Sequence, residues 1–264
     1  MKKIINKTRK AQVSIFVIIA VILVVIVGLF FFLKDKVWIK FGGVNQDFIT
    51  NPEIFIDSCL QPSVRETADL MIKQGGYVNP TLYRDFENEK VAFLCYQEDY
   101  YYSCVNQEAV LLTHLKDEIH EAILPDMNDC FKQLEDGIKR SGGSFTKSNL
   151  NYEIKLNSEK ITVEISLDGK IEKSGEINNV KAMRSVITHP LYDLAVVVQE
   201  ITRQEAEHCD FEQLGFMLFY PHIGVEKFVT GDDTTVYTVI DRESNKNFRF
   251  AVRSCVVPPA TTGR

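Results

Sequence analysis

The feature that most constrains this chain is a stretch of 22 residues without a charged side chain, Gln12–Leu33 (QVSIFVIIAVILVVIVGLFFFL). At a rise of about 1.5 Å per residue, a helix of this length measures roughly 33 Å, enough to cross roughly 30 Å of hydrocarbon in a bilayer. In lipid, a helix satisfies its own backbone hydrogen bonds. The sequence therefore predicts a single-pass transmembrane helix over residues 12–33, with the lipid bilayer as its partner.

The charges beside the apolar stretch give the predicted helix a direction. Five basic residues precede it and three follow it closely. Because basic residues accumulate on the cytoplasmic side, residues 1–11 are expected to form a basic cytoplasmic leader and residues 34–264 to be extracytoplasmic at the cell membrane. A cleaved secretory signal is the alternative, but its apolar core would be shorter, about 7–15 residues.

The boundary between the basic leader and the apolar stretch carries a resemblance to a known family. The segment Arg9-Lys10-Ala11-Gln12-Val13-Ser14 resembles the class III signal peptide of archaeal type IV pilin-like proteins. The resemblance implies that a prepilin peptidase cuts between Ala11 and Gln12 and leaves the apolar helix on the mature protein. Position 16 is Phe where many pilins have Glu, so the resemblance concerns processing more than filament assembly.

A second resemblance concerns the wider layout of the chain. Cys59 and the sequence Gln74-Gly75-Gly76-Tyr77 are similar to a cysteine-bearing helix that ends in Gln-Gly-Gly-Tyr in uncharacterised archaeal membrane proteins. This resemblance implies a membrane-anchored surface protein and brings no known activity.

The charge of the part beyond the predicted helix excludes one class of partner. The whole chain has a net charge of −6, but residues 41–264 hold 22 basic and 35 acidic residues. Nucleic-acid binding needs a basic surface that neutralises phosphates. A nucleic-acid partner is therefore not expected.

The apolar periodicity predicts an α+β fold, with helices packed on antiparallel sheet. After a linker over residues 34–50, residues 51–140 are expected to form a helical subdomain with one β-hairpin. Residues 145–255 are expected to form an α+β subdomain with antiparallel strands. Residues 256–264 are expected to be a flexible tail.

Local signals divide these subdomains into elements. Pro62 and Pro125 are expected to kink or interrupt two helices. The hairpin strands are predicted at Val91–Tyr96 and Tyr100–Cys104, both rich in strand-forming residues. Asp168–Gly169 is predicted to be the turn between two strands of alternating polarity.

All six cysteines follow the apolar stretch, and an even number in an exported domain favours three disulfides. Cys95 and Cys104 flank a short tyrosine-rich segment, Cys59 and Cys130 fall on apolar helix faces, and Cys209 and Cys255 remain. Buried free thiols are the main alternative. A zinc site is less favoured because no two cysteines are spaced as in CxxC.

Chemistry-bearing clusters are few, and no catalytic motif is present, so neither an enzyme nor a cofactor is expected. His114 and Glu118 share one helix face and, with His208 near a later helix end, are weak metal candidates. The alternative without a metal is that His114 and Glu118 lie on a solvated helix surface and that His208 lies in a polar helix end.

The densest aromatic cluster is formed by Tyr96, Tyr100, Tyr101 and Tyr102. Because tyrosine is common at recognition surfaces, the cluster is a candidate contact surface for another subunit, a glycan or a cell-wall polymer. The alternative is that alternate rings pack on the core.

Three functions follow from these patterns. The first is an anchored surface protein, pilin-like at its N-terminus, that binds or assembles as a homo-oligomer or with other envelope proteins. The second is an anchored receptor domain for a small ligand or sugar, which needs an enclosed pocket. The third is an anchored hydrolase built from scattered residues near His114, Glu118 or His208.

Overall fold

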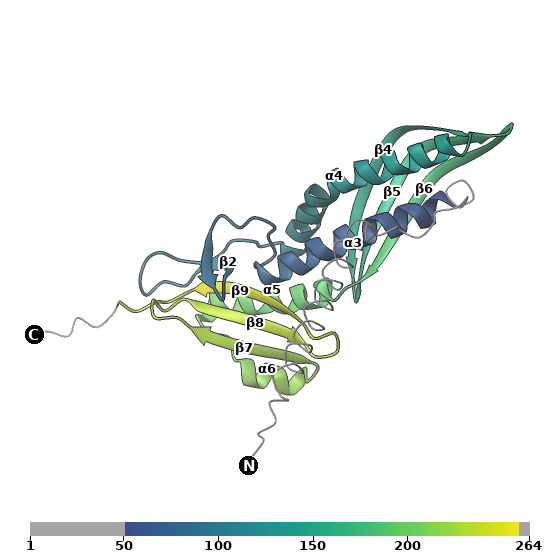
Figure 1. The fold of residues 1–264 in the computed structure, drawn as a ribbon. Helices are drawn as coiled ribbons and strands as arrows, with labels where there is room; N and C mark the ends of the chain where they lie inside the picture. Colours follow the sequence, from purple (N-terminus) through teal and green to yellow (C-terminus); the bar gives the residue numbers. More distant parts are fainter. Residues whose placement is uncertain (1–50, 259–264) are drawn as a thin grey trace, which may run out of the picture. The chain divides into compact units, whose positions relative to one another are not determined.

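The computed structural model describes residues 51–258, and Figure 1 shows their fold. The predicted leader (1–11), transmembrane helix (12–33) and linker (34–50) lie outside the described residues, as does the tail from 259 onward. Within residues 51–258, none of the helices combines the length and the hydropathy needed to cross a bilayer.

Helices and strands follow one another without regular alternation, so the expected α+β class is confirmed for the described residues. The helices are α3 (Pro52–Lys73), α4 (Leu111–Arg140), α5 (Leu191–His208) and α6 (Gln213–Phe219). The strands are β1 (Tyr83–Phe86), β2 (Glu89–Tyr96), β3 (Val105–Asn106), β4 (Ser144–Asn157), β5 (Lys160–Lys173), β6 (Glu176–Thr188), β7 (Ile223–Val229), β8 (Thr235–Asp241) and β9 (Lys246–Arg253).

The larger sheet has six strands, in the order β1-β2-β9-β8-β7, with β3 also paired to β2. Its neighbours run antiparallel, except that β2 and β9 are parallel. The expectation of purely antiparallel strands is wrong for this pair, because β2 and β9 meet from distant parts of the chain rather than through a hairpin. Helix α5 packs against β8 and β9, and α6 against β7 (Figure 1).

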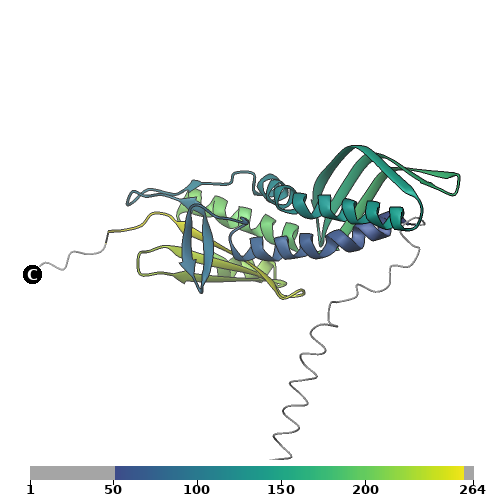
Figure 2. The ribbon, with the colours of Figure 1, turned by 45° about the horizontal axis from the view of Figure 1, so that its top comes forward.

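The smaller sheet is the antiparallel meander β4-β5-β6. Side chains alternate along β5, and the buried set is Ile161, Val163, Ile165, Leu167 and Ile171. Helices α3 and α4 lie side by side against this buried face, α3 next to β6 and α4 next to β4 (Figures 1 and 2). The other face is polar and exposed, as the alternating pattern predicts.

The expected interruption at Pro125 is wrong, and the helix is not restarted at Pro62. Pro62 lies inside α3 and Pro125 lies inside the 30-residue helix α4. The buried residues Ile119, Ile123 and Met127 keep four-residue spacing across Pro125. A proline inside a helix costs about 3 kcal/mol, and each buried aliphatic side chain contributes about 1.5–3 kcal/mol, so the packing of this face outweighs the lost backbone bond.

The predicted turn at Asp168–Gly169 is also wrong, because both residues lie inside β5. The pairing register shifts there against both neighbouring strands, which marks a bulge. A Cβ on Gly169 would lie 3.1 Å from the carbonyl oxygen of Val180 and 3.3 Å from Cε2 of Phe145. Glycine is therefore placed here for close backbone approach inside a strand.

The predicted hairpin has the correct first strand and the wrong second strand. β2 pairs with β1, which precedes it, across a turn at Glu87 and Asn88 with φ of +50° and +67°. The segment Tyr100–Cys104 contains no strand, and only the two residues of β3 follow it. The strand-forming residues of Tyr100–Cys104 therefore lie in a loop, where a strand was predicted.

The structure contains three disulfides and no free cysteine among residues 51–258. They join Cys59 to Cys130, Cys95 to Cys104 and Cys209 to Cys255. The prediction of disulfide bonds is confirmed, and the metal and free-thiol alternatives do not apply to these six residues.

Candidate functional site

The metal candidates His114 and Glu118 fasten the segment after α3 onto α4. His114 Nε2 lies 3.1 Å from the carbonyl oxygen of Gly76, and its ring lies 4.2 Å from the ring of Tyr77. The carboxylate of Glu118 accepts a hydrogen bond of 2.7 Å from the backbone N–H of Val78. Both side chains are therefore engaged in holding a turn.

The same turn explains the Gln-Gly-Gly-Tyr sequence. Gly75 and Gly76 have φ of +73° and +93°, and a Cβ on Gly75 would lie 2.9 Å from Cβ of Ala92 on β2. Tyr77 Oη donates a 2.5 Å hydrogen bond to Glu108. Burial and the Glu108 carboxylate raise the pKa of Tyr77, so the phenol stays protonated as a donor. The turn joins α3, β2 and α4 closely.

His208 lies elsewhere, exposed at the end of α5, with Nε2 3.6 Å from Glu207 Oε2. Across residues 51–258, no three His, Cys, Asp or Glu side chains are arranged to hold a metal ion. The structure thus brings His114 and Glu118 to one turn, where they bind backbone groups, and leaves His208 on a separate helix end.

Sequence patterns did not identify two polar clusters, each built around one buried side chain, His189 or Glu205. In one, His189 and Lys246 both contact the carboxylate of Asp69 on α3. In the other, the buried Glu205 accepts a hydrogen bond from Tyr237 Oη. Both sets join residues that are far apart in the chain, and no local pattern marks them.

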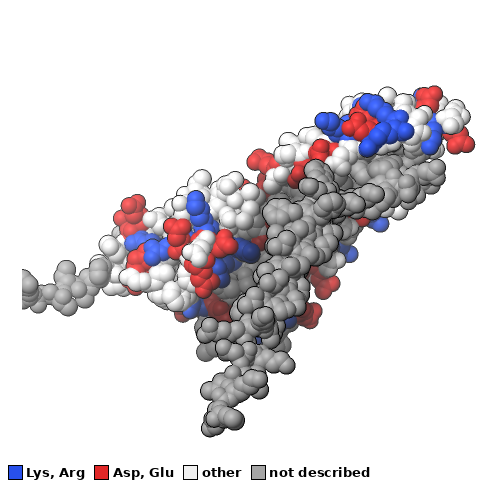
Figure 3. All heavy atoms as spheres, in the orientation of Figure 1, with Lys and Arg blue, Asp and Glu red and all other residues white. Residues whose placement is uncertain are grey.

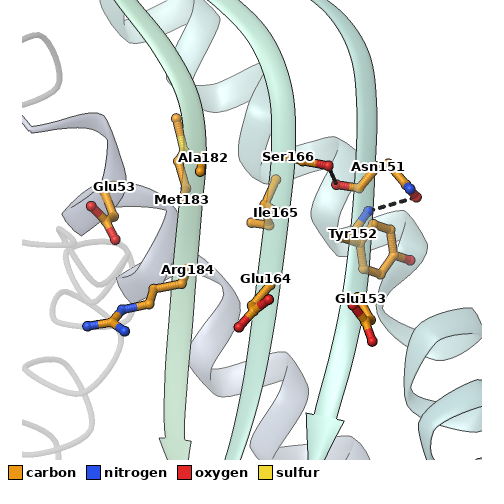
Figure 4. A pocket seen from close by; sticks show the side chains of 10 residues that line it. All are labelled: Glu53, Asn151, Tyr152, Glu153, Glu164, Ile165, Ser166, Ala182, Met183 and Arg184. Atoms are coloured by element: carbon orange, nitrogen blue, oxygen red, sulfur yellow. Dashed lines mark hydrogen bonds between the residues drawn. The ribbon is translucent and has the colours of Figure 1, made fainter.

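A pocket of about 370 Å³ opens on the smaller sheet (Figure 4). Glu153, Glu164 and Arg184 are register neighbours on β4, β5 and β6, and Glu164 also pairs with Lys155 at 2.5 Å. Glu53 reaches the pocket from α3, on the side where Arg184 extends. The complete lining is Glu53, Asn151, Tyr152, Glu153, Glu164, Ile165, Ser166, Ala182, Met183 and Arg184.

The predicted tyrosine cluster divides into one packed ring and three exposed rings. Tyr96 ends β2 and packs edge-on against Phe93 with ring centroids 5.0 Å apart. Tyr100, Tyr101 and Tyr102 are exposed by 43%, 68% and 65%. Residues 97–104, here called the tyrosine loop, therefore place three consecutive rings in solvent.

The backbone of the tyrosine loop is fixed to the last described residues of the chain. Tyr101 N–H donates to the carbonyl of Val256 at 2.9 Å, and Cys255 N–H donates to the carbonyl of Tyr102 at 2.8 Å. Arg253 donates to the carbonyls of Gln97 and Glu98. Its guanidinium lies 5.6 Å from the centre of the Tyr100 ring, where a cation is attracted to the aromatic face.

Two disulfides close the frame around the tyrosine loop. Cys95–Cys104 joins the two ends of the loop, with 5.2 Å between its Cα atoms. Cys209–Cys255 joins the end of α5 to the C-terminal segment that hydrogen-bonds to the loop. Within this frame Tyr101 has φ of +68°, a conformation that aromatic residues rarely adopt. Such a conformation persists where the surroundings determine it, and it often marks a functional segment.

Charge around these features is mixed. On the face drawn in Figure 3, basic and acidic side chains of the described residues are interspersed and form no single basic surface. The exposed carboxylates Glu98 and Asp99 lie beside Tyr100 in the loop. The tyrosine loop thus offers flat apolar rings bordered by hydrogen-bond acceptors.

No family model, curated protein or solved structure matches this chain.

Proposed function

We propose that this chain is a membrane-anchored extracytoplasmic surface protein with a binding or assembly role, and that the tyrosine loop is its contact surface. The observation that carries the proposal is the exposure of three consecutive tyrosine rings on a backbone fixed by hydrogen bonds and disulfides. Aromatic side chains bury much area at a low cost in conformational entropy, and a fixed backbone lowers that cost further.

The proposed location draws support from two features of the chain. The 22-residue apolar stretch Gln12–Leu33 supplies the anchor, and three disulfides suit an oxidising compartment. The leader that ends at Ala11 supports processing by a prepilin peptidase before Gln12. Protease shaving of intact cells tests the location, and the N-terminal residue of the mature chain tests the processing.

The contact surface is tested with the full-length chain in vesicles. Envelope fragments from cells that lack the protein serve as the probe, and their retention by the vesicles is measured. We expect Y100A/Y101A/Y102A to lower retention at least tenfold. Replacing the same tyrosines with phenylalanine should cost less, because the rings remain. Tyr83→Ala, on β1, is the control and should retain the fragments like the unchanged chain. Equal retention by the triple alanine variant would exclude the loop.

A second candidate function, an anchored receptor for a small ligand, is favoured by the pocket on the smaller sheet. Arg184 lies beside Glu164 and has no ion-pair partner within residues 51–258, so the pocket offers charges of both signs. Free amino acids and monosaccharides are the probes. A rise in melting temperature that Arg184→Ala removes would support this function, and a flat response across the panel would count against it.

A further inference from the structure

Helix α6 carries apolar side chains on both of its faces. On its inner face Phe216 contacts the buried Phe211, with ring centroids 5.4 Å apart, and Met217 Sδ accepts a 3.2 Å hydrogen bond from the backbone N–H of Val225. On its outer side four residues, here called the α6 face, are exposed: Leu214 by 68%, Leu218 by 80%, Phe219 by 79% and Tyr220 by 49%.

The α6 face has no charge within it. Residues 213–221 contain no acidic or basic side chain. Glu212, which precedes them, folds back to accept hydrogen bonds from the N–H groups of Leu214 and Gly215 at 3.2 and 2.5 Å. A helix that is apolar all round is normally covered, and a contiguous exposed patch of this kind marks a contact site.

We infer that the α6 face docks on the surface of the bilayer to which the chain is anchored. This inference rests on the proposed membrane anchor. Seventeen residues separate Leu33 from Asn51, where the described unit begins. They span at most about 60 Å, so the unit is confined close to the lipid. A tether of this kind raises the effective concentration of the surface, and a modest apolar contact then suffices.

The size of the patch favours lipid over a second copy of the chain. Four side chains exposed to this extent offer on the order of 500 Å², whereas each partner in a stable protein interface contributes about 800 Å². Leucine and phenylalanine suit the boundary between headgroups and acyl chains, and tyrosine suits the headgroup level. The seven-residue helix is far too short to span the bilayer, so it lies along its surface.

The test uses the full-length chain with Trp38, its only tryptophan, replaced by phenylalanine. Phe219→Trp then places a single probe on α6, and Ile177→Trp, exposed on β6, is the matched control. Each variant is reconstituted into phosphatidylcholine vesicles with and without brominated acyl chains. We expect bromine to quench emission of the probe at 219 at least twofold more than that of the probe at 177.

Further outcomes separate the inference from the anchor. Leu214→Asp and Leu218→Asp change exposed positions and should each remove the extra quenching. A chain that floats with the vesicles but shows equal quenching at 219 and 177 overturns the inference and leaves the anchor intact. A probe at 219 that is shielded from both bromine and aqueous iodide indicates a protein cover and also overturns it. A chain that does not float defeats both the anchor and the docking.

Discussion

His189 directly follows β6, and its Nε2 lies 3.0 Å from Oδ1 of Asp69 on α3, a contact across 120 residues of chain. The backbone N–H of Leu191 donates to Nδ1 of the same ring at 3.1 Å, so the ring is neutral and Nε2 carries the proton. Lys246 from β9 pairs with the same carboxylate. The carboxylate of Asp69 therefore connects α3 to both sheets.

This geometry predicts that the protein loses stability as the pH falls below about 6.5. Burial lowers the pKa of His189 from its ordinary value of 6.5, although Asp69 opposes the shift. The unfolded chain therefore takes up a proton at a higher pH than the folded chain does. Burial raises the pKa of Asp69, but hydrogen bonds from Lys246 and His189 outweigh it and lower the pKa below 3.8, so Asp69 contributes only at lower pH.

Urea denaturation at pH 7.5, 6.5 and 5.5 measures this dependence. His189→Gln should cost about 2 kcal/mol at pH 7.5, because it disturbs two hydrogen bonds, and should flatten the pH dependence. His208→Gln, at an exposed position, is the control and should leave the change of unfolding free energy with pH unaltered. An unchanged slope in His189→Gln would contradict the assignment.

The environment of Glu205 predicts a pH dependence of stability with the opposite sign. Burial raises the pKa of this carboxyl above its ordinary value of 4.5, against the hydrogen bond from Tyr237 and the charge of Lys227. The unfolded chain releases its proton first as the pH rises through 4.5, so stability falls until the folded carboxyl also ionises. Glu205→Gln should remove this decrease, as measured by unfolding between pH 4 and 7. The exposed Glu207→Gln should retain it.

The two disulfides that involve the N-terminal half of the described chain should differ in their contributions. Cys59–Cys130 closes 71 residues and Cys95–Cys104 closes nine. Loop-closure entropy predicts losses of about 4 kcal/mol for C59A/C130A and about 2.5 kcal/mol for C95A/C104A. Chemical denaturation of both pairs measures the difference. An equal loss would show that chain entropy does not set these contributions.

Two glycines with left-handed backbone form a matched pair. Gly75 has φ of +73° and Ala92 directly beside it, whereas Gly142 has φ of +82° and no atom within 4 Å of an added Cβ. Gly142→Ala should cost only the strain of the backbone, about 1 kcal/mol. Gly75→Ala should cost about 3 kcal/mol, because the clash adds to the strain. Similar losses in free energy of unfolding would refute the role given to the Gly-Gly turn.

The sequence predicted those parts of the fold that local patterns determine. The alternating polarity before Asp168 predicted a strand with one buried face, which lies in β5, and the strand formers Val91–Tyr96 predicted β2. The local rules failed where tertiary packing opposed them. Pro125 is tolerated because the buried face of α4 continues on both sides of it, and Asp168–Gly169 forms a bulge because Phe145 and Val180 approach it closely.

The candidate site was predictable in composition but not in geometry. Tyr96 and Tyr100–Tyr102 are adjacent in the sequence, so their cluster was visible there. The backbone that presents the three exposed rings depends on contacts with Arg253 and Val256, which are about 150 positions away. The contact of Asp69 with His189 and Lys246 had no local signal, because three separate segments supply it.

The parallel pairing of β2 with β9 sets an order for biogenesis. When the chain is synthesised from its amino end, β2 emerges long before Arg253, the partner of Tyr96 at the end of β9. The centre of the larger sheet must stay open until β9 has also been synthesised, and such long-range pairing is slow. During that interval the edge of β2 that later pairs with β9 is available to chaperones or to other nascent chains. Removal of β9 alone would leave a persistent, aggregation-prone intermediate rather than a shortened folded protein.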